Sequence, residues 1–254
     1  TLTAAIAFRP VSADAEANTK TSEVIAKKTL SAPDMDTLIS RDSWGEPVAV
    51  LTKNSYNADT VRQAPADTEM EIYLMWDMEY IYLGVVSPDE DFVYSPARDN
   101  PAEGYQYWEG DGIQFRLTGA DGATSASACI TMTPDGKVAM NSRTSQGPVK
   151  TDLYSQAIKY VDGKMYTTMA IPQADLGMTA SDIKAGAVYM LDLLRICGTE
   201  NDTYAGWLIW GEFWDHGNEN NGSNVTRNKV VLVDPNTPEK GGDGEEEFES
   251  RLLN

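Results

Sequence analysis

The stretch from Met70 to Leu117 opens with MEIYLMWDMEYIYLGVV (70–86) and closes, after an acidic loop, with YWEGDGIQFRL (107–117). In its first part, apolar residues alternate on both sides of the short connection Asp77–Glu79. The alternating positions are Ile72, Leu74 and Trp76 before the connection and Ile81, Leu83 and Val85 after it. This period of two, rich in Ile, Val, Tyr and Trp, predicts a pair of β-strands. The intervening positions are also apolar or aromatic, so we expect both faces of the pair to be covered.

Similar runs recur along the rest of the chain and predict further strands. They are Val48–Leu51, Gly112–Thr118, Ala126–Thr133, Lys137–Asn141, Ser155–Tyr160, Met165–Ile171, Val188–Ile196, Trp207–Trp210 and Lys229–Val233. Asp162-Gly163 is the best hairpin signal, because both residues tolerate a positive φ. The segment Pro172–Gly177 predicts one helical turn that ends at the glycine. The sequence therefore predicts an all-β fold: an antiparallel two-sheet β-sandwich, jelly-roll-like, with about ten to twelve strands and little helix.

Composition divides the chain into three parts. Residues 1–30 are interpreted as an N-terminal arm or first strand, or as what remains of an export segment. Residues 31–235 hold the predicted sandwich. Residues 236–254 are rich in Gly, Pro and acidic side chains, which is typical of a linker or tail. Within the sandwich, the loop over 88–107 is too long for an idle connection, so we expect it to carry function.

The chain of 254 residues has a formal net charge of −19. Such a charge repels phosphates, so the sequence argues against nucleic acid as a partner and against anionic membrane surfaces. No apolar run approaches the length that crosses a bilayer, so we expect no membrane insertion. Two cysteines, Cys129 and Cys197, lie inside strand-like runs. They form either a disulfide or two buried free thiols.

Three parts of the sequence together resemble carbohydrate-binding module family 9, within the DOMON-like β-sandwich superfamily. The central stretch WDMEYIYLGVVSPDEDF…YWEGDGIQFRL is similar to that family's hairpin and the strand after it. Upstream, APDMDTLISRDSWGEPVAV (32–50) resembles the family's opening, and downstream GAVYMLDLLRICGTENDTYAGWLIWG (186–211) resembles its last long strand followed by a Trp. Each motif is short, and the resemblance depends on their order and spacing.

The resemblance implies a sugar unit held between two tryptophans. An indole ring covers the C–H face of a pyranose, and polar side chains then bond the hydroxyls at the sugar's edge. By motif position one ring belongs to Trp108. The second comes from a late segment, with Trp210 as first choice and with Trp207 and Trp214 behind it. The alternative for the late tryptophans is core packing.

Two further residues match positions at which the family bonds sugar hydroxyls. Gln114 stands where the family has Glu or Gln, and Arg195 matches an arginine near the end of the long late strand. The alternative for both residues is an ordinary polar position on a strand facing solvent. A structural calcium ion is also implied, because calcium takes several oxygen ligands, which Asp89, Asp91 and Asp99 could supply together with Glu90 and Asn100. A solvated acidic loop is the alternative for these residues.

An enzyme is not expected. The single histidine, His216, has no nucleophile motif beside it. We expect a secreted or cell-surface, non-catalytic carbohydrate-binding module whose partners are a polysaccharide or oligosaccharide and other modules of the same polypeptide. It would hold a glycan unit at a chain end within a larger extracellular enzyme or surface protein. The alternatives are a structural or adhesive sandwich of a cell-surface assembly without sugar binding, and a haem-binding relative.

Overall fold

The structure, a computed structural model, describes residues 23–52, 68–96, 108–119, 125–144, 147–148, 155–210 and 228–236. These residues form thirteen strands and two single helical turns. The strands are β1 (Glu23–Lys28), β2 (Ala49–Thr52), β3 (Glu69–Trp76), β4 (Tyr80–Pro88), β5 (Gly112–Thr118), β6 (Ser125–Met132), β7 (Val138–Thr144), β8 (Gly147–Pro148), β9 (Ser155–Val161), β10 (Lys164–Pro172), β11 (Val188–Thr199), β12 (Asp202–Trp210) and β13 (Asn228–Val233). The turns are α1 (Arg41–Trp44) and the 3-10 helix η3 (Gln173–Leu176). The predicted all-β class is confirmed.

The strands form one hydrogen-bonded sheet. Its order is β8-β7-β6-β5-β11-β13-β1-β3-β4-β10-β9, with β12 added to β11 and β2 added to β3. The pairs of β1 with β13 and with β3 are parallel, and the other described pairs are antiparallel. The prediction of two separate antiparallel sheets is therefore corrected to a single mixed sheet. The physical reason is β1, whose two parallel pairings join what would otherwise be two sheets.

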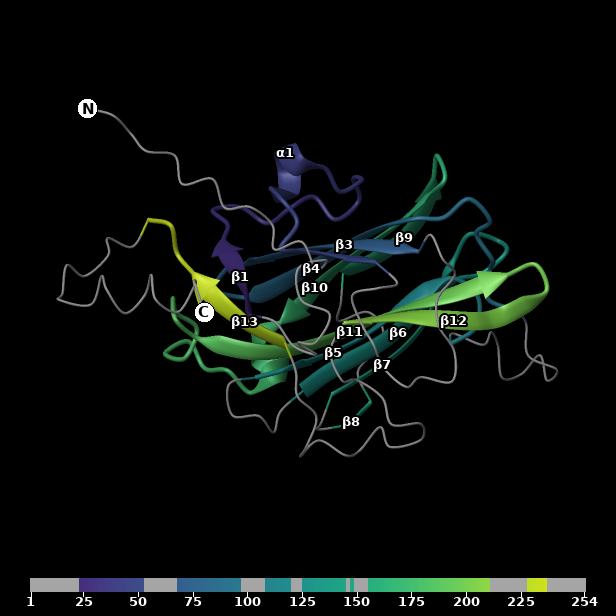
Figure 1. Cartoon of the computed structure of the whole chain (residues 1–254). Helices are drawn as coiled ribbons and strands as arrows, with labels where there is room; N and C mark the ends of the chain where they lie inside the picture. The colour runs from purple at the N-terminus through teal and green to yellow at the C-terminus, as the bar shows by residue number, and fades with distance from the viewer. Residues whose placement is uncertain are drawn as a thin grey trace, which may run out of the picture.

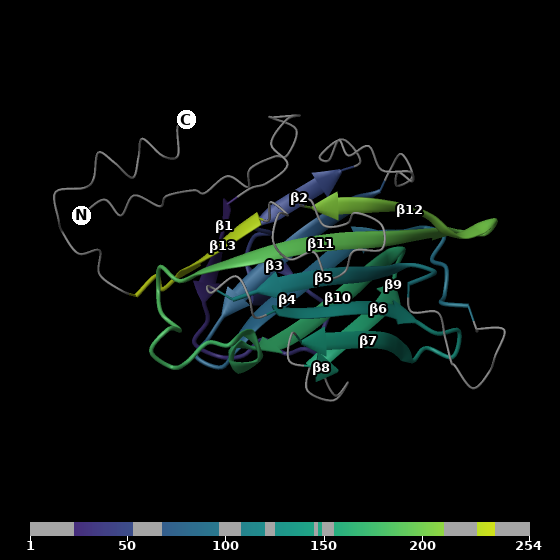
Figure 2. The ribbon, with the colours of Figure 1, turned by 90° about the horizontal axis from the view of Figure 1, so that it is seen from below.

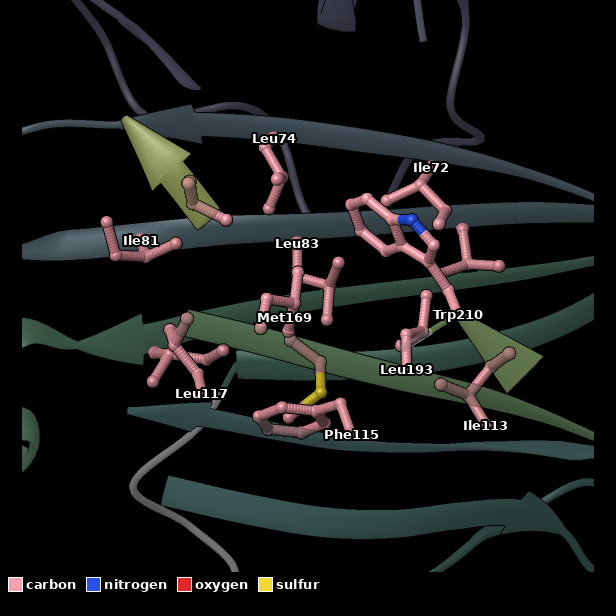
Figure 3. Packing of buried hydrophobic residues seen from close by; sticks show 14 of the residues in the cluster. Ile72, Leu74, Ile81, Leu83, Ile113, Phe115, Leu117, Met169, Leu193 and Trp210 are labelled. Carbon is pink, nitrogen blue, oxygen red and sulfur yellow. The ribbon is translucent and has the colours of Figure 1, made fainter. Parts of the chain in front are cut away.

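The sheet curls so that its two flanks face each other. One flank, with β3, β4, β9 and β10, lies across from the other, with β5, β6, β7, β11 and β12 (Figure 1; Figure 2). The β9 end of the path approaches the second flank, because β9 lies against β6. Between the flanks lies the main core, to which both contribute buried side chains (Figure 3). Its members include Ile72, Leu83, Phe115, Met169 and Leu193.

The β3–β4 hairpin has the predicted alternation. All six of the alternating positions over 72–85 are in the main core. On the opposite face of the hairpin, Tyr73 and Tyr82 pack with Ile39 and Trp44 in a second buried cluster. The carboxylate of Asp77 closes the turn, because its Oδ1 accepts hydrogen bonds from the backbone N–H groups of Glu79 and Tyr80 at 2.7 and 2.8 Å. Both faces of the hairpin are covered, as the sequence indicates.

Two predicted turns are confirmed by their backbone geometry. Between β9 and β10, Asp162 has φ of 50° and Gly163 has φ of 70°, while Val161 and Lys164 pair directly. The turn after Pro172 is η3, and its C-cap is Gly177 in the left-handed conformation.

The N-terminal part contains a strand, one of the alternatives that the sequence left open for residues 1–30. Strand β1, at 23–28, is part of the sheet, and Ala26 within it is fully buried. The other predicted boundary region, 236–254, lies almost wholly outside the described residues, as do residues 1–22.

The two cysteines are buried thiols and are not joined in a disulfide. Cys129 belongs to an apolar cluster on the face of β6 that is turned away from the main core. Cys197 lies next to Thr68, with Sγ 3.9 Å from its Oγ1. Of the two alternatives left open by the sequence, the structure has the buried free thiols.

Candidate functional site

An apolar cluster covers one face of the β5, β6, β11 and β12 flank. On these strands alternate side chains enter the main core, among them Ile113, Phe115, Leu193 and Trp210. The side chains between them point to the opposite face, which Figure 2 views from outside. There Cys129, Leu194, Ile196, Trp207 and Ile209 pack together, and Trp108 packs against them. We call this group the outer-face cluster.

Strand register explains why residues distant in sequence meet in the outer-face cluster. Gln114 of β5 pairs with Leu194 of β11 and with Cys129 of β6, so these three side chains form one row across the sheet. On the other side of β11, Leu194 pairs with Ile209, and Ile196 pairs with Trp207. Gln114 is partly exposed and lies within this otherwise apolar row.

The outer-face cluster is largely shielded from water. Trp207 is 8% exposed, and the other four buried members are less exposed than Trp207. Trp108 is partly exposed. The cluster therefore has one accessible indole, that of Trp108, and Gln114 lies in the row beside Leu194 and Cys129.

Trp108 is held in place by the turn that precedes β5. Gly110 has φ of 86°, and a Cβ added there would lie 2.7 Å from the carbonyl oxygen of Val93. Asp111 fixes the same turn, because its N–H donates to Val93 O at 2.7 Å and its Oδ2 accepts from the Val93 N–H at 2.6 Å. Positive φ and close backbone approach both favour glycine at 110.

A buried ionic cluster lies on the core side of β11, beneath this turn. Arg195, 2% exposed, has Nη1 2.8 Å from Asp111 Oδ1 and Nη2 2.5 Å from Asp89 Oδ2. Its Nε donates to Ser87 Oγ at 3.2 Å, and Nη1 also donates to the carbonyl oxygen of Ile196. All three guanidinium nitrogens are therefore bonded within the protein.

The two carboxylates of this cluster are also engaged elsewhere. Asp111 Oδ1 accepts a second bond from the Gly198 N–H at 3.1 Å, and Asp89 Oδ1 accepts from the Asp91 N–H at 3.2 Å. Burial raises the pKa of Asp89 to about 6, and the nearby Asp111 adds to the rise, while the guanidinium of Arg195 opposes it. Through Asp89 and Asp111, this ionic cluster connects the loop after β4 to the turn that follows Trp108.

Two of the three residues chosen for the implied calcium ion, Asp89 and Asp91, lie in the described ranges. Asp89 already faces the guanidinium of Arg195, a cation, and Asp91 is exposed two residues along the loop. No group of three or more His, Cys, Asp or Glu side chains in the described ranges could hold a metal. Asp99 lies outside these ranges, so the calcium set as a whole stays a prediction.

The structure brings some of the predicted sugar-binding residues together and separates others. Trp108, Gln114 and Trp207 share the outer face. Trp210, the first choice for the second tryptophan, is 6% exposed and lies in the main core (Figure 3). Arg195 is on the core side as well, and Trp214 is outside the described residues.

Two features of the site were not anticipated from the sequence. Asp111, which both fixes the Trp108 turn and pairs with Arg195, was not singled out. Neither was the apolar patch formed by Leu194, Ile196 and Ile209. A signal for the patch exists, because WLIW is apolar at consecutive positions and LLRIC has an apolar pair on each side of Arg195, which is typical of strands covered on both faces.

Within the described parts of the chain, no helix is long and apolar enough to cross a membrane.

Comparison with solved structures places the fold. A carbohydrate-binding module of family 9 from Caldicellulosiruptor kristjanssonii, in complex with cellotriose, superposes with a TM-score of 0.55 at 10% sequence identity, covering 88% of this chain and 97% of that one. The fold is shared with family 9. In a complex with glucose, a module of the same description and organism gives a TM-score of 0.54 at 11% identity, covering 83% and 96%.

A third similar structure comes from Bacteroides uniformis. It is a protein to which a carbohydrate-binding role has been ascribed, with a TM-score of 0.52 at 10% identity, covering 84% of this chain and 99% of that one. No protein-family model matches the sequence, and no curated protein matches it. At these identities the likeness concerns the fold alone.

Proposed function

We propose that the protein is a non-catalytic carbohydrate-binding module whose glycan unit is held on the outer face of β5, β6, β11 and β12, between Trp108 and Trp207. The observation that carries the proposal is the outer-face cluster, in which a partly exposed indole lies on an apolar floor that includes a second indole. Trp207 takes the place that the sequence favoured for Trp210, since Trp210 belongs to the main core.

The chemistry of this face suits a sugar ring. Stacking a pyranose on Trp108 removes apolar surface from water, which contributes about 25 cal/mol per Å². Gln114 offers an amide with two donors and a carbonyl acceptor close to the same floor, which suits the hydroxyls at the sugar's edge. An amide in place of a carboxylate removes one negative charge from the site, which favours neutral sugars as ligands.

The proposed setting is extracellular. The modules with a shared fold are complexed with cellotriose and glucose, which makes cello-oligosaccharides the first ligands to try. In this proposal the protein is secreted or on the cell surface, works beside other modules of one polypeptide and binds a chain end. Catalysis by the module is not part of it.

The test is calorimetric titration of the folded protein with cellotriose. Trp108→Ala should weaken binding by about tenfold or more, because loss of one stacked ring is worth at least ~1.4 kcal/mol. Trp44→Phe is the matched control, since Trp44 is buried in the cluster on the other flank. Equal affinity of the Trp108 variant and the wild type, or no binding of any cello- or xylo-oligosaccharide by the wild type, would refute the proposal.

The shielding of the outer-face cluster favours a second candidate. Because Trp207 is only 8% exposed, the face also suits a packed surface of a structural or adhesive module. Under that candidate Trp108→Ala lowers the free energy of unfolding or disrupts assembly and has no effect on glycan binding. Urea unfolding and sedimentation of the same variant separate the two candidates.

A further inference from the structure

Three aromatic side chains, two from the segment after β4 and one from β9, form a further cluster beside the main core. The rings of Phe92 and Tyr160 stack with centroids 4.8 Å apart and an interplanar angle of 24°. Tyr94 packs edge-to-face on Phe92 at 5.2 Å. Tyr94 is 39% exposed, and the other two rings are partly exposed at the margin of the main core. We call these three residues the rim aromatic cluster.

The rim aromatic cluster is fixed to the same turn as Trp108. Val93 lies between Phe92 and Tyr94 in the sequence. Its carbonyl oxygen accepts a hydrogen bond from the Asp111 N–H, and its own N–H donates to the Asp111 carboxylate. The carbonyl carbon of Tyr94 is 2.8 Å from the position of a Cβ built on Gly110. The backbone of Tyr94 therefore lies directly against the residue two positions after Trp108.

Contacts on both sides hold the rings in place. Ser95 N donates to Met132 O at 2.8 Å, and Asp89 N donates to Gly163 O at 2.8 Å, so both ends of the segment are tied to neighbouring strands. The hydroxyl of Tyr160 donates to Glu90 O at 3.3 Å. A ligand would meet a surface that is already ordered, which lowers the entropy cost of binding.

The chemistry beside the rings selects a class of ligand. Exposed carboxylates of Glu90 and Asp91 lie on the same short segment as Phe92 and Tyr94. Carboxylates accept hydrogen bonds from hydroxyl groups and repel anions. Aromatic faces with carboxylate acceptors suit an uncharged polyhydroxylated chain and disfavour one that carries uronic acids.

We propose that the rim aromatic cluster is a second sugar subsite, which binds further units of a neutral glycan chain whose end unit lies at Trp108. This inference rests on the proposed function, since it extends the same site along the rim. It adds a length dependence, because only a chain of several units can reach both aromatic groups.

Titration with glucose and with cellohexaose tests the subsite. The wild type should bind cellohexaose more tightly than glucose. Tyr94→Ala should weaken cellohexaose by about tenfold and leave glucose unchanged, while Tyr94→Phe keeps the ring and should retain cellohexaose affinity. Met78→Ala, at another exposed apolar position, is the control and should change neither. Hexagalacturonate should bind more weakly than cellohexaose.

The outcomes separate the subsite from the proposed function. If Trp108→Ala weakens both ligands while Tyr94→Ala affects neither, the subsite is refuted and the function stands. The subsite is also refuted if Tyr94→Ala weakens glucose binding as much as cellohexaose binding. It is refuted as well if the wild type binds glucose and cellohexaose with equal affinity. Binding of hexagalacturonate as tightly as cellohexaose contradicts the neutral class. If folded wild type binds none of these sugars, both proposals fail.

Discussion

The guanidinium of Arg195 faces two carboxylates, so this buried centre carries a net negative charge once Asp89 is ionised above about pH 6. Removing the cation would leave Asp89 and Asp111 as like charges in a water-poor site. Breaking a buried ion pair from one side costs far more than the pair contributes as a whole, because the remaining charge has lost both its partner and its hydration.

We therefore expect Arg195→Met to lower the free energy of unfolding by about 3–5 kcal/mol. Arg195→Lys should recover only part of this loss, because an ammonium cannot contact Ser87, Asp89 and Asp111 together as the guanidinium does. Arg41→Met is the control, since its ion pair with Glu46 is exposed and should change stability by less than ~0.5 kcal/mol. Urea unfolding followed by tryptophan fluorescence measures all three, and equal stability of the Met variants would contradict the expectation.

Single positions also show where sequence reasoning stops. The motif match placed Gln114 on the strand that follows Trp108, and the structure has both on the outer face. For Arg195 the motif match predicted a position on a strand but not the face of the sheet to which the side chain points. Its side chain points to the core side, where it contacts the carboxylates of Asp111 and Asp89. These two residues precede Arg195 by 84 and 106 positions in the chain. Such distant partners leave no local pattern to read.

At the scale of elements, strands with two different faces were predictable and strands with similar faces were not. The β3–β4 hairpin was located because its core positions follow a clear period of two over 72–85. On β11 and β12 both faces carry apolar side chains. The sequence pattern therefore does not indicate which positions face the core and which face outward. The register between β11 and β12 decides that Trp207 is on the outer face and Trp210 in the core.

The β9–β10 turn gives a prediction at this scale. Gly163→Ala puts a Cβ on a residue with φ of 70°, a left-handed conformation that costs a non-glycine residue about 1–2 kcal/mol. We expect the free energy of unfolding to fall by that amount with the fold retained, as seen by circular dichroism and urea unfolding. Asp162→Asn is the control, because asparagine also tolerates positive φ, and it should be close to neutral. An unchanged midpoint for Gly163→Ala would show that the turn has another conformation.

For the molecule as a whole, the pKa of Asp89 links stability to pH. Its folded-state value of about 6 lies above the ordinary 3.8, so between these values the folded protein holds more protons on Asp89 than the unfolded chain does. The free energy of unfolding therefore gains from this group at low pH and loses that gain as pH rises through 6.

Asp89→Asn should remove this dependence. We expect the difference in free energy of unfolding, wild type minus variant, to decrease as pH rises from 4 to 7, whatever constant offset the lost ion pair adds. Asp91→Asn, two residues away and exposed, should follow the wild type across the range. Urea unfolding at half-unit steps of pH gives the curves, and parallel lines for wild type and Asp89→Asn would disprove the link.

The position of β1 has a consequence for how the chain reaches this form. Strand β1 lies beside β13, so Val24 pairs with Val230, more than two hundred residues away. A ribosome must therefore release more than two hundred further residues before β1 can pair with β13. Topologies of such high contact order fold slowly. Until that moment the edge of β1 that receives β13 is open, and chaperones that shield bare strand edges would favour a high yield of native protein.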